Sequence, residues 1–89
     1  MKHWKLQLAP SAARALDRVP HAVATAIAEF LVGPLLENPE RVGKPLQGEL
    51  AGYHSARRGA YRIVYRIVAE ESVVRVVRIE HRADVYRPR

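Results

Sequence analysis

The hydrophobic residues near the start of the chain alternate with polar ones. Trp4, Leu6 and Leu8 would all point to one side of an extended chain, with the residues between them on the other side. This period of two predicts a first β-strand. Pro10 ends the alternation, because proline has no backbone N–H to contribute to a strand ladder.

Two helices are predicted next. Ser11 is expected to cap a short helix over residues 12–18, and Pro20 separates this helix from a second one that begins near residue 21. In the second helix the apolar residues recur at spacings of four, seven and eight, which indicates a face turned toward the core. The residues of this stripe are Val23, Ile27, Phe30 and Leu31.

Glycine and proline interrupt the middle of the chain. Residues 33–34, Gly-Pro, should end or bend the second helix, with one more turn before the next proline. Residues 38–45 are rich in proline and glycine and predict a loop. After it we expect a strand over residues 46–57, with a bulge at Gly48 or Gly52.

The clearest strand of the chain covers residues 60–68. It places Tyr61, Ile63, Tyr65 and Ile67 on one side and Arg62, Val64, Arg66 and Val68 on the other. Residues 69–72 predict a hairpin loop, and residues 73–80 are apolar enough for a central strand. We expect the tyrosines to pack in the core.

This order of elements predicts one α+β domain over residues 1–89. Two helices from the N-terminal half should pack on one face of a small, mainly antiparallel four-stranded sheet, in the order strand-helix-helix-strand-strand-strand. The other face would stay open. Because Arg62 and Arg66 lie on the polar side of their strand, both are expected on that open face.

The charge of the chain is concentrated in its second half. The formal net charge is +6, yet residues 1–40 hold four basic and four acidic residues, whereas residues 41–89 hold eleven basic and five acidic ones. Twelve of the fifteen basic residues are arginine. A guanidinium binds phosphate through two parallel hydrogen bonds and stacks on bases, so this half favours a nucleic-acid partner.

Other features exclude several classes of protein. There is no cysteine, which excludes a disulfide framework and a thiolate metal site. No apolar run approaches the roughly 20 residues of a membrane span, and the first ten residues lack the apolar core of a secretion signal. We therefore expect a cytoplasmic protein with no metal site, no small-molecule cofactor and no membrane contact.

The second half also carries a long motif. The stretch KPLQGELAGYHSARRGAYRIVYRI (residues 44–67), followed by VVRIEHRADVYR (residues 76–87), resembles the RelE toxins of the RelE/ParE superfamily, particularly the actinobacterial ones. The resemblance implies the toxin of a type II toxin–antitoxin system. Such a toxin is an endoribonuclease that cuts mRNA in the ribosomal A site, inhibits translation and is neutralised by a RelB-like antitoxin. Two alternatives stay open: a ParE-like toxin that inhibits DNA gyrase without catalysis, and a non-enzymatic basic module that binds RNA or ribosomes.

Metal-free RNA cleavage needs a base for the 2′-hydroxyl, cations for the phosphorane-like transition state and an acid for the departing 5′-oxygen. It yields a 2′,3′-cyclic phosphate and a 5′-hydroxyl. By resemblance, Arg62 and Arg82 would hold the transition-state charge. His81 could act as base or acid because imidazole titrates near neutrality, and Tyr86 would stack on a base or assist proton transfer. Glu80 could orient His81 or neutralise the patch.

The chain departs from the RelE pattern at two positions. His54 and Ala56 stand where the resemblance leads us to expect lysines, which leaves the acid–base assignment open. Arg57 and Arg58 could supply the missing positive charge, or form an ordinary solvated surface. The residues predicted to contact RNA are Lys44, His54, Arg57, Arg58 and Arg66.

Overall fold

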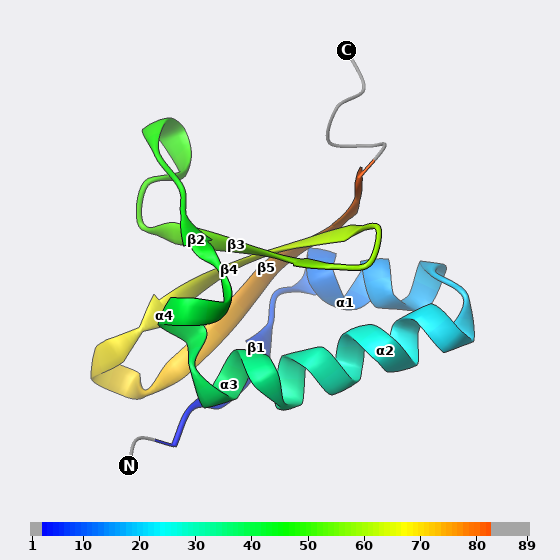
Figure 1. The fold of residues 1–89 in the computed structure, drawn as a ribbon, viewed down its shortest axis with the longest axis horizontal. Helices are drawn as coiled ribbons and strands as arrows, with labels where there is room; N and C mark the ends of the chain where they lie inside the picture. Colours follow the sequence, from blue (N-terminus) through cyan, green and yellow to red (C-terminus); the bar gives the residue numbers. More distant parts are fainter. Residues whose placement is uncertain (1–2, 83–89) are drawn as a thin grey trace.

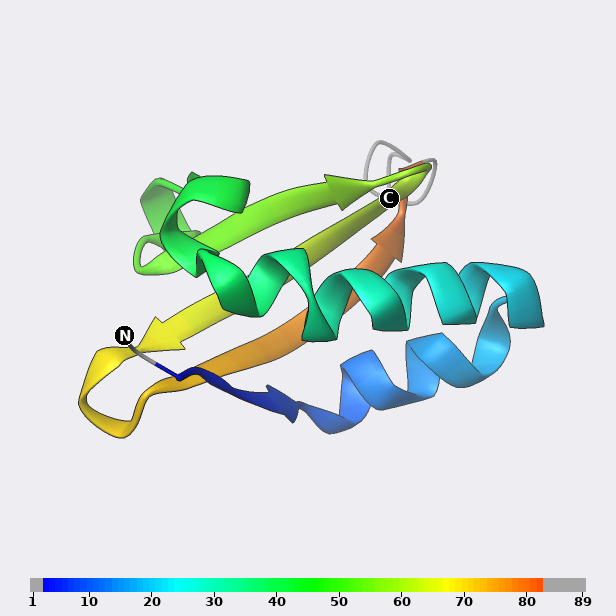
Figure 2. The ribbon, with the colours of Figure 1, turned by 60° about the horizontal axis from the view of Figure 1, so that its bottom comes forward.

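The computed structural model describes residues 3–82, in which a single sheet is covered on one face by helices (Figure 1). Figure 2 shows α1 and α2 lying side by side in front of the sheet. The helical elements are α1 (Pro10–Arg18), α2 (His21–Val32), α3 (Pro34–Glu37), α4 (Pro39–Val42) and the 3-10 turns η1 (Gly48–Leu50) and η2 (Ala69–Glu71). The strands are β1 (Lys5–Leu8), β2 (Lys44–Pro45), β3 (Tyr53–Arg58), β4 (Tyr61–Val68) and β5 (Val73–His81).

The predicted α+β class is confirmed, with one strand more than expected. The sheet has five strands in the order β1-β5-β4-β3-β2, and only the β1–β5 pair is parallel. The additional strand is β2, whose two residues pair with Ser55 and His54 of β3. No helix within residues 3–82 combines the length and the apolar character that crossing a membrane requires.

The strand predicted over residues 46–57 is wrong in its first half. Only residues 53–58 are extended in the sheet, and η1 occupies part of the preceding segment. Gly48 and Gly52 have φ angles of +70° and +95°, a left-handed conformation that turns the chain away from the sheet. The Leu46 backbone N–H donates a hydrogen bond of 2.8 Å to the Tyr53 carbonyl oxygen. Residues 46–53 therefore form a closed loop at the edge of the sheet.

The bulge lies in β5 and not at the predicted glycines. Val64 pairs with Arg78 and Tyr65 pairs with Val76, so Val77 has no partner in the ladder. The hydroxyl of Ser11 donates a hydrogen bond of 2.6 Å to the Val77 carbonyl oxygen. Ser11 therefore does not cap α1 as predicted. The helix begins two residues earlier than predicted, at Pro10, whose fixed φ suits the first helical position.

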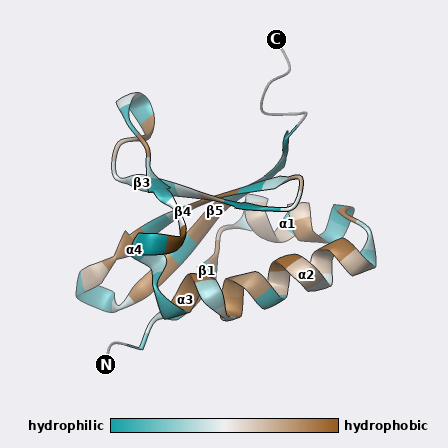
Figure 3. Ribbon diagram, in the orientation of Figure 1, coloured by the Kyte–Doolittle hydropathy of each residue, from teal (hydrophilic) through white to brown (hydrophobic). Residues whose placement is uncertain are grey.

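The core lies between the helices and the inner face of the sheet. Figure 3 shows the hydrophobic colouring along α2 and along the middle of β4 and β5. The predicted stripe of α2 faces this core: Ile27 and Leu31 are buried, and Val23 and Phe30 are half-buried. The sheet contributes Ala56, Ile63, Tyr65, Val74, Val76 and Ile79.

Tyr65 attaches α4, which forms inside the predicted loop, to the sheet. The side chain is fully buried, and its hydroxyl donates a hydrogen bond of 2.5 Å to the Pro39 carbonyl oxygen. Burial raises the pKa of Tyr65 to about 12, an effect partly opposed by a hydrogen bond with the Gly43 backbone. A side chain at Gly43 would come within 2.5 Å of this hydroxyl and 2.6 Å of the Ser55 carbonyl oxygen, so only glycine fits there.

We expect Tyr65→Phe to lower the free energy of unfolding by about 1–3 kcal/mol, because it leaves the buried Pro39 carbonyl without its donor. Urea unfolding at neutral pH measures this loss. Tyr61→Phe removes the same hydroxyl from a half-buried tyrosine of the same strand and should cost less. Equal losses in the two variants would contradict the role given to the Tyr65 hydroxyl.

The same hydroxyl has a pH signature. The folded pKa of about 12 lies above the ordinary value of 10.0, so the unfolded chain loses this proton first as pH rises. The stability linked to Tyr65 is thus complete below pH 10 and falls between pH 10 and 12. The Tyr65→Phe variant should lack this part of the fall in stability at alkaline pH, which urea unfolding at several pH values measures.

Candidate nucleic-acid interface

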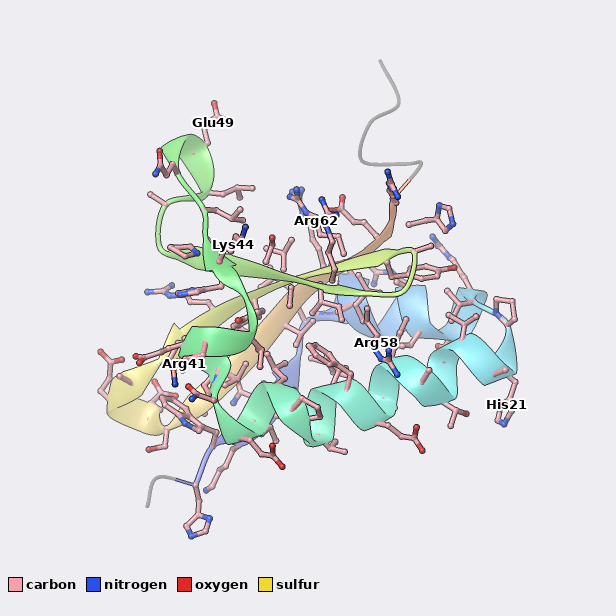
Figure 4. The ribbon with its side chains drawn as sticks, viewed as in Figure 1. His21, Arg41, Lys44, Glu49, Arg58 and Arg62 are labelled. Atoms are coloured by element: carbon pink, nitrogen blue, oxygen red, sulfur yellow. The ribbon has the colours of Figure 1, made fainter. Side chains whose placement is uncertain are left out.

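The face of the sheet that the helices leave bare carries most of the sheet's arginines. Figure 4 shows Arg62 directed away from the helices, whereas Arg58 lies on the side of α2. Strand alternation and pairing register place a set of residues on this bare side, which we call the open face. Its members include Gln7, Lys44, Tyr53, Ser55, Arg57, Arg62, Val64, Arg66, Arg75, Arg78 and Glu80.

The bulge decides which β5 residues belong to the open face. Arg75 and Arg78 are three positions apart, so a regular strand would direct them to opposite sides. The unpaired Val77 changes the phase, and both arginines pair with open-face residues of β4: Arg75 with Arg66, and Arg78 with Val64. The open face therefore gains one arginine more than alternation would give.

A shallow cavity of about 110 Å³ lies at one end of the open face. The β3–β4 turn and the end of β5 form its walls, which are joined by a hydrogen bond of 2.7 Å from the Arg82 backbone N–H to the Ala60 carbonyl oxygen. Three arginines, a serine and a tyrosine are among the lining residues, and this combination suits a phosphate group and its ribose. The lining residues are Ser55, Arg57, Gly59, Ala60, Tyr61, Arg62 and Arg82.

Arg62 is held by a carboxylate on the neighbouring strand. Its Nε lies 3.7 Å from the Oε1 atom of Glu80, which pairs directly with it across β4 and β5. Both atoms are buried and have no hydrogen-bond partner within the described residues. The predicted exposure of Arg62 is therefore only partial: the side chain lies on the open face and is 29% exposed. This contact orients the guanidinium and offsets part of its charge.

The predicted site residues fall on both sides of the sheet. Arg57, Arg62 and Arg82 meet at the cavity, and Lys44 and Arg66 lie elsewhere on the open face. His54 and Arg58 lie on the side of the helices: His54 stacks on Tyr65 with ring centroids 5.5 Å apart, and Arg58 lines hollows beside α2. Tyr86 lies outside the described residues.

His81 borders the cavity from the helix side. It pairs with Tyr61 across the sheet, and the two rings meet edge to face with centroids 5.1 Å apart. Tyr61 is one of the residues that line the cavity, although its strand position puts its side chain, like that of His81, on the helix side. The structure thus brings His81 to the edge of the arginine group and not into it.

The sequence analysis missed several members of the open face, one of which is also part of the cavity wall. The hydroxyl of Ser55 is part of the cavity wall, and the phase of β3, counted from buried Ala56, could have placed it there. The same phase places Tyr53 on the open face. No local signal could have found both Arg75 and Arg78, because their common side depends on the bulge. Within residues 3–82, no three His, Asp or Glu side chains gather as ligands for a metal ion.

The chain matches a known family of toxins along most of its length. Residues 6–86 match the profile described as the ParE toxin of the type II toxin–antitoxin system parDE, and the chain belongs to this family. Toxin RelG of Mycobacterium tuberculosis is 46% identical over 84 residues, covering 94% of this chain and 97% of that protein. Toxin RelE of the same organism is also 46% identical, covering 94% of this chain and 87% of that protein.

The solved structures agree with this assignment. The toxin–antitoxin complex RelBE2 from Mycobacterium tuberculosis contains a chain that is 45% identical, with a TM-score of 0.88 and coverage of 94% of this chain and 97% of that one. The isolated RelE toxin of E. coli is 25% identical with a TM-score of 0.73, covering 94% of this chain and 90% of that one. The expected relationship to RelE toxins is confirmed.

Proposed function

We propose that this toxin is a ribosome-dependent endoribonuclease that cleaves mRNA and so inhibits translation. The observation that carries the proposal is the cavity on the open face, where Arg57, Arg62 and Arg82 converge. Three cations around one small space match the needs of a phosphate whose charge grows during the reaction. The identity to toxins named RelE supports the same conclusion.

In this mechanism the scissile phosphate lies between the arginines. The ribose 2′-hydroxyl attacks the phosphorus, the bond to the 5′-oxygen breaks, and the products are a 2′,3′-cyclic phosphate and a 5′-hydroxyl. Arg62 and Arg82 hold the charge that develops on the phosphoryl oxygens, and Arg57 adds positive potential beside them. Glu80 keeps Arg62 oriented before the substrate arrives.

Proton transfer is assigned to His81 or Tyr86. His81 contacts Tyr61 and directly precedes Arg82, both of which line the cavity, and an imidazole can give or take a proton. The two positions where lysines were expected do not offer this chemistry: Ala56 is buried in the core, and His54 is stacked against Tyr65 on the helix side. Neither of these two residues lines the cavity, whereas His81 adjoins two residues that do, Tyr61 and Arg82.

Expression of the free toxin should arrest growth and translation. Messenger RNA fragments with 5′-hydroxyl ends should accumulate in an extract that contains ribosomes, and not in one from which ribosomes were removed. Because the family profile is that of ParE, gyrase is the alternative target. Supercoiling assays in parallel decide: growth arrest with intact message and DNA breaks trapped on gyrase would replace the nuclease mechanism with gyrase inhibition.

Removing one preorganised charge from a transition state typically lowers the rate by about 10²–10³. We expect Arg62→Ala and Arg82→Ala each to cause a loss of this size in message cleavage while the fold is kept. Arg18→Ala, an exposed arginine of α1, is the matched control and should cleave like the wild type. Wild-type rates in both site variants would remove the arginines from the mechanism.

His81→Ala separates the two candidates for proton transfer. A loss of about 10²–10⁴ is expected if His81 is the base or the acid. Full activity would move this role to Tyr86.

The partner of this toxin is proposed to be a RelB-like antitoxin. The M. tuberculosis relative was solved as a toxin–antitoxin complex, and the open face here offers an acidic or amphipathic segment a basic surface to cover. We expect the complex to bury more than about 1,200 Å². The antitoxin should be largely unfolded alone and order on binding.

Co-purification with the product of the neighbouring gene tests the partner. The complex should lack nuclease activity and should unfold at a higher temperature than the free toxin, because a ligand that binds only the folded state stabilises it. A toxicity rescue assay gives the cellular readout. If the chain is tolerated in cells without any neighbour and purifies alone at high yield, the toxin–antitoxin assignment fails for this copy.

A further inference from the structure

A row of four side chains crosses the open face at a distance from the cavity. The strand register aligns Tyr53 of β3 with Arg66 of β4, Arg66 with Arg75 of β5, and Arg75 with Gln7 of β1. Residues that pair in a sheet point to the same side, so these four form a continuous strip. We call it the distal row.

The two arginines of the distal row are arranged as if for a shared anion. They stand directly opposite each other, and like charges in that position destabilise a sheet. The row contains no carboxylate. The Nε of Arg75 donates a hydrogen bond of 3.0 Å to the Gln7 side-chain oxygen. This bond fixes the Arg75 guanidinium and leaves its terminal nitrogens for a ligand.

Tyr53 adds an aromatic ring at the end of the same row. It is half-buried and directly follows Gly52, whose φ of +95° lets the chain turn into β3 at this point. An aromatic side chain beside paired cations is the combination that binds single-stranded nucleic acid, since the ring stacks on a base and the cations hold the backbone.

We propose that the distal row is a second nucleotide-binding subsite for single-stranded RNA, in which Arg66 and Arg75 hold a backbone phosphate and Tyr53 stacks on a base. The proposal rests on the proposed nuclease function. Arg66 follows Arg62 by four residues on β4, so the subsite lies about 13 Å along the strand from the cavity. Lys44 and Arg78 lie in the row between, so the positive potential is continuous from one site to the other.

The distal row suits RNA and offers no edge to an added β-strand. The row crosses the interior of the sheet, where the backbone groups of β4 and β5 are already paired, so a partner strand cannot add here. The most exposed large hydrophobic residue of the described part, Val32, lies on α2 and so on the covered side of the sheet. A phosphate and a base need only the cations and the ring that the row offers.

The test measures binding of uncleavable 2′-O-methyl RNA of three and of six nucleotides to the purified chain at several salt concentrations. The wild type should bind the longer RNA more tightly. In the double variant Arg66→Gln/Arg75→Gln, this gain should disappear, and the slope of log K against log salt should fall by about 0.7 for each phosphate that the variant no longer neutralises. Arg14→Gln/Arg18→Gln, on exposed positions of α1, is the control and should keep the wild-type slope.

A second pair of variants isolates the ring. Tyr53→Leu should weaken binding of the six-nucleotide RNA about five-fold or more, the range of one base–aromatic stack, while Tyr53→Phe keeps the ring and should bind like the wild type. Thermal unfolding of each variant shows that the fold is intact. The Arg66→Gln/Arg75→Gln variant should be at least as stable as the wild type, because it removes a like-charge pair.

The outcomes separate this proposal from the nuclease function. Equal binding of both RNA lengths by the wild type, or unchanged binding and salt slope in the arginine variant, overturns the subsite even if message is cleaved. Length-dependent binding that disappears in the variants supports the subsite even if no cleavage is found, in which case only the nuclease function fails. If the arginine variant binds RNA normally but no longer forms the antitoxin complex, the row is a protein-binding surface and the proposal is wrong.

Discussion

The placement of charge in this toxin depends on one unpaired residue in its central strand pair. Val77 has no partner in the ladder between β4 and β5, and its carbonyl oxygen accepts a hydrogen bond from the Ser11 hydroxyl at the start of α1. The Ser11 hydroxyl of α1 thus gives a hydrogen-bond donor to the carbonyl oxygen of the residue that the bulge leaves unpaired. The bulge sets the phase of β5 on its two sides, so Val74 and Ile79 both face the core although they are five residues apart. A regular strand would have forced either an arginine into the core or a valine out of it.

The sequence predicted the elements whose signal is local. The alternation of β4 was enough to place Ile63 in the core and Arg62 on the other face, and the helical spacing of Ile27 and Leu31 identified the buried side of α2. The failures have non-local causes. The strand β2 exists only because two residues meet β3, and residues 46–52 leave the sheet because two glycines adopt left-handed angles instead of the extended angles of a strand.

The candidate site also has residues that the sequence predicted correctly and residues that it could not place. The resemblance to RelE toxins pointed to Arg62 and Arg82, and both line the cavity. It gave no means of telling that His54 and Arg58 are on the helix side, because this depends on the phase of β3. Counting alternate residues from buried Ala56 would have separated them from Arg57. The sequence could not predict the contact between Arg62 and Glu80, because this contact follows from the register of β4 and β5 beyond the bulge.

The parallel pairing of β1 has a consequence for the order of folding. Gln7 and its partner Arg75 are 68 residues apart, whereas β4 and β5 are joined by a tight turn. Loop closure favours the nearby pair, so the hairpin can form early and the first strand of the chain joins last. Until it does, the outer edge of β5 presents unpaired backbone groups to any other extended segment. The finished fold hides that edge behind four residues, and a nascent or partly unfolded chain exposes it, which makes the delay before β1 docks the period in which this protein is most open to misassembly.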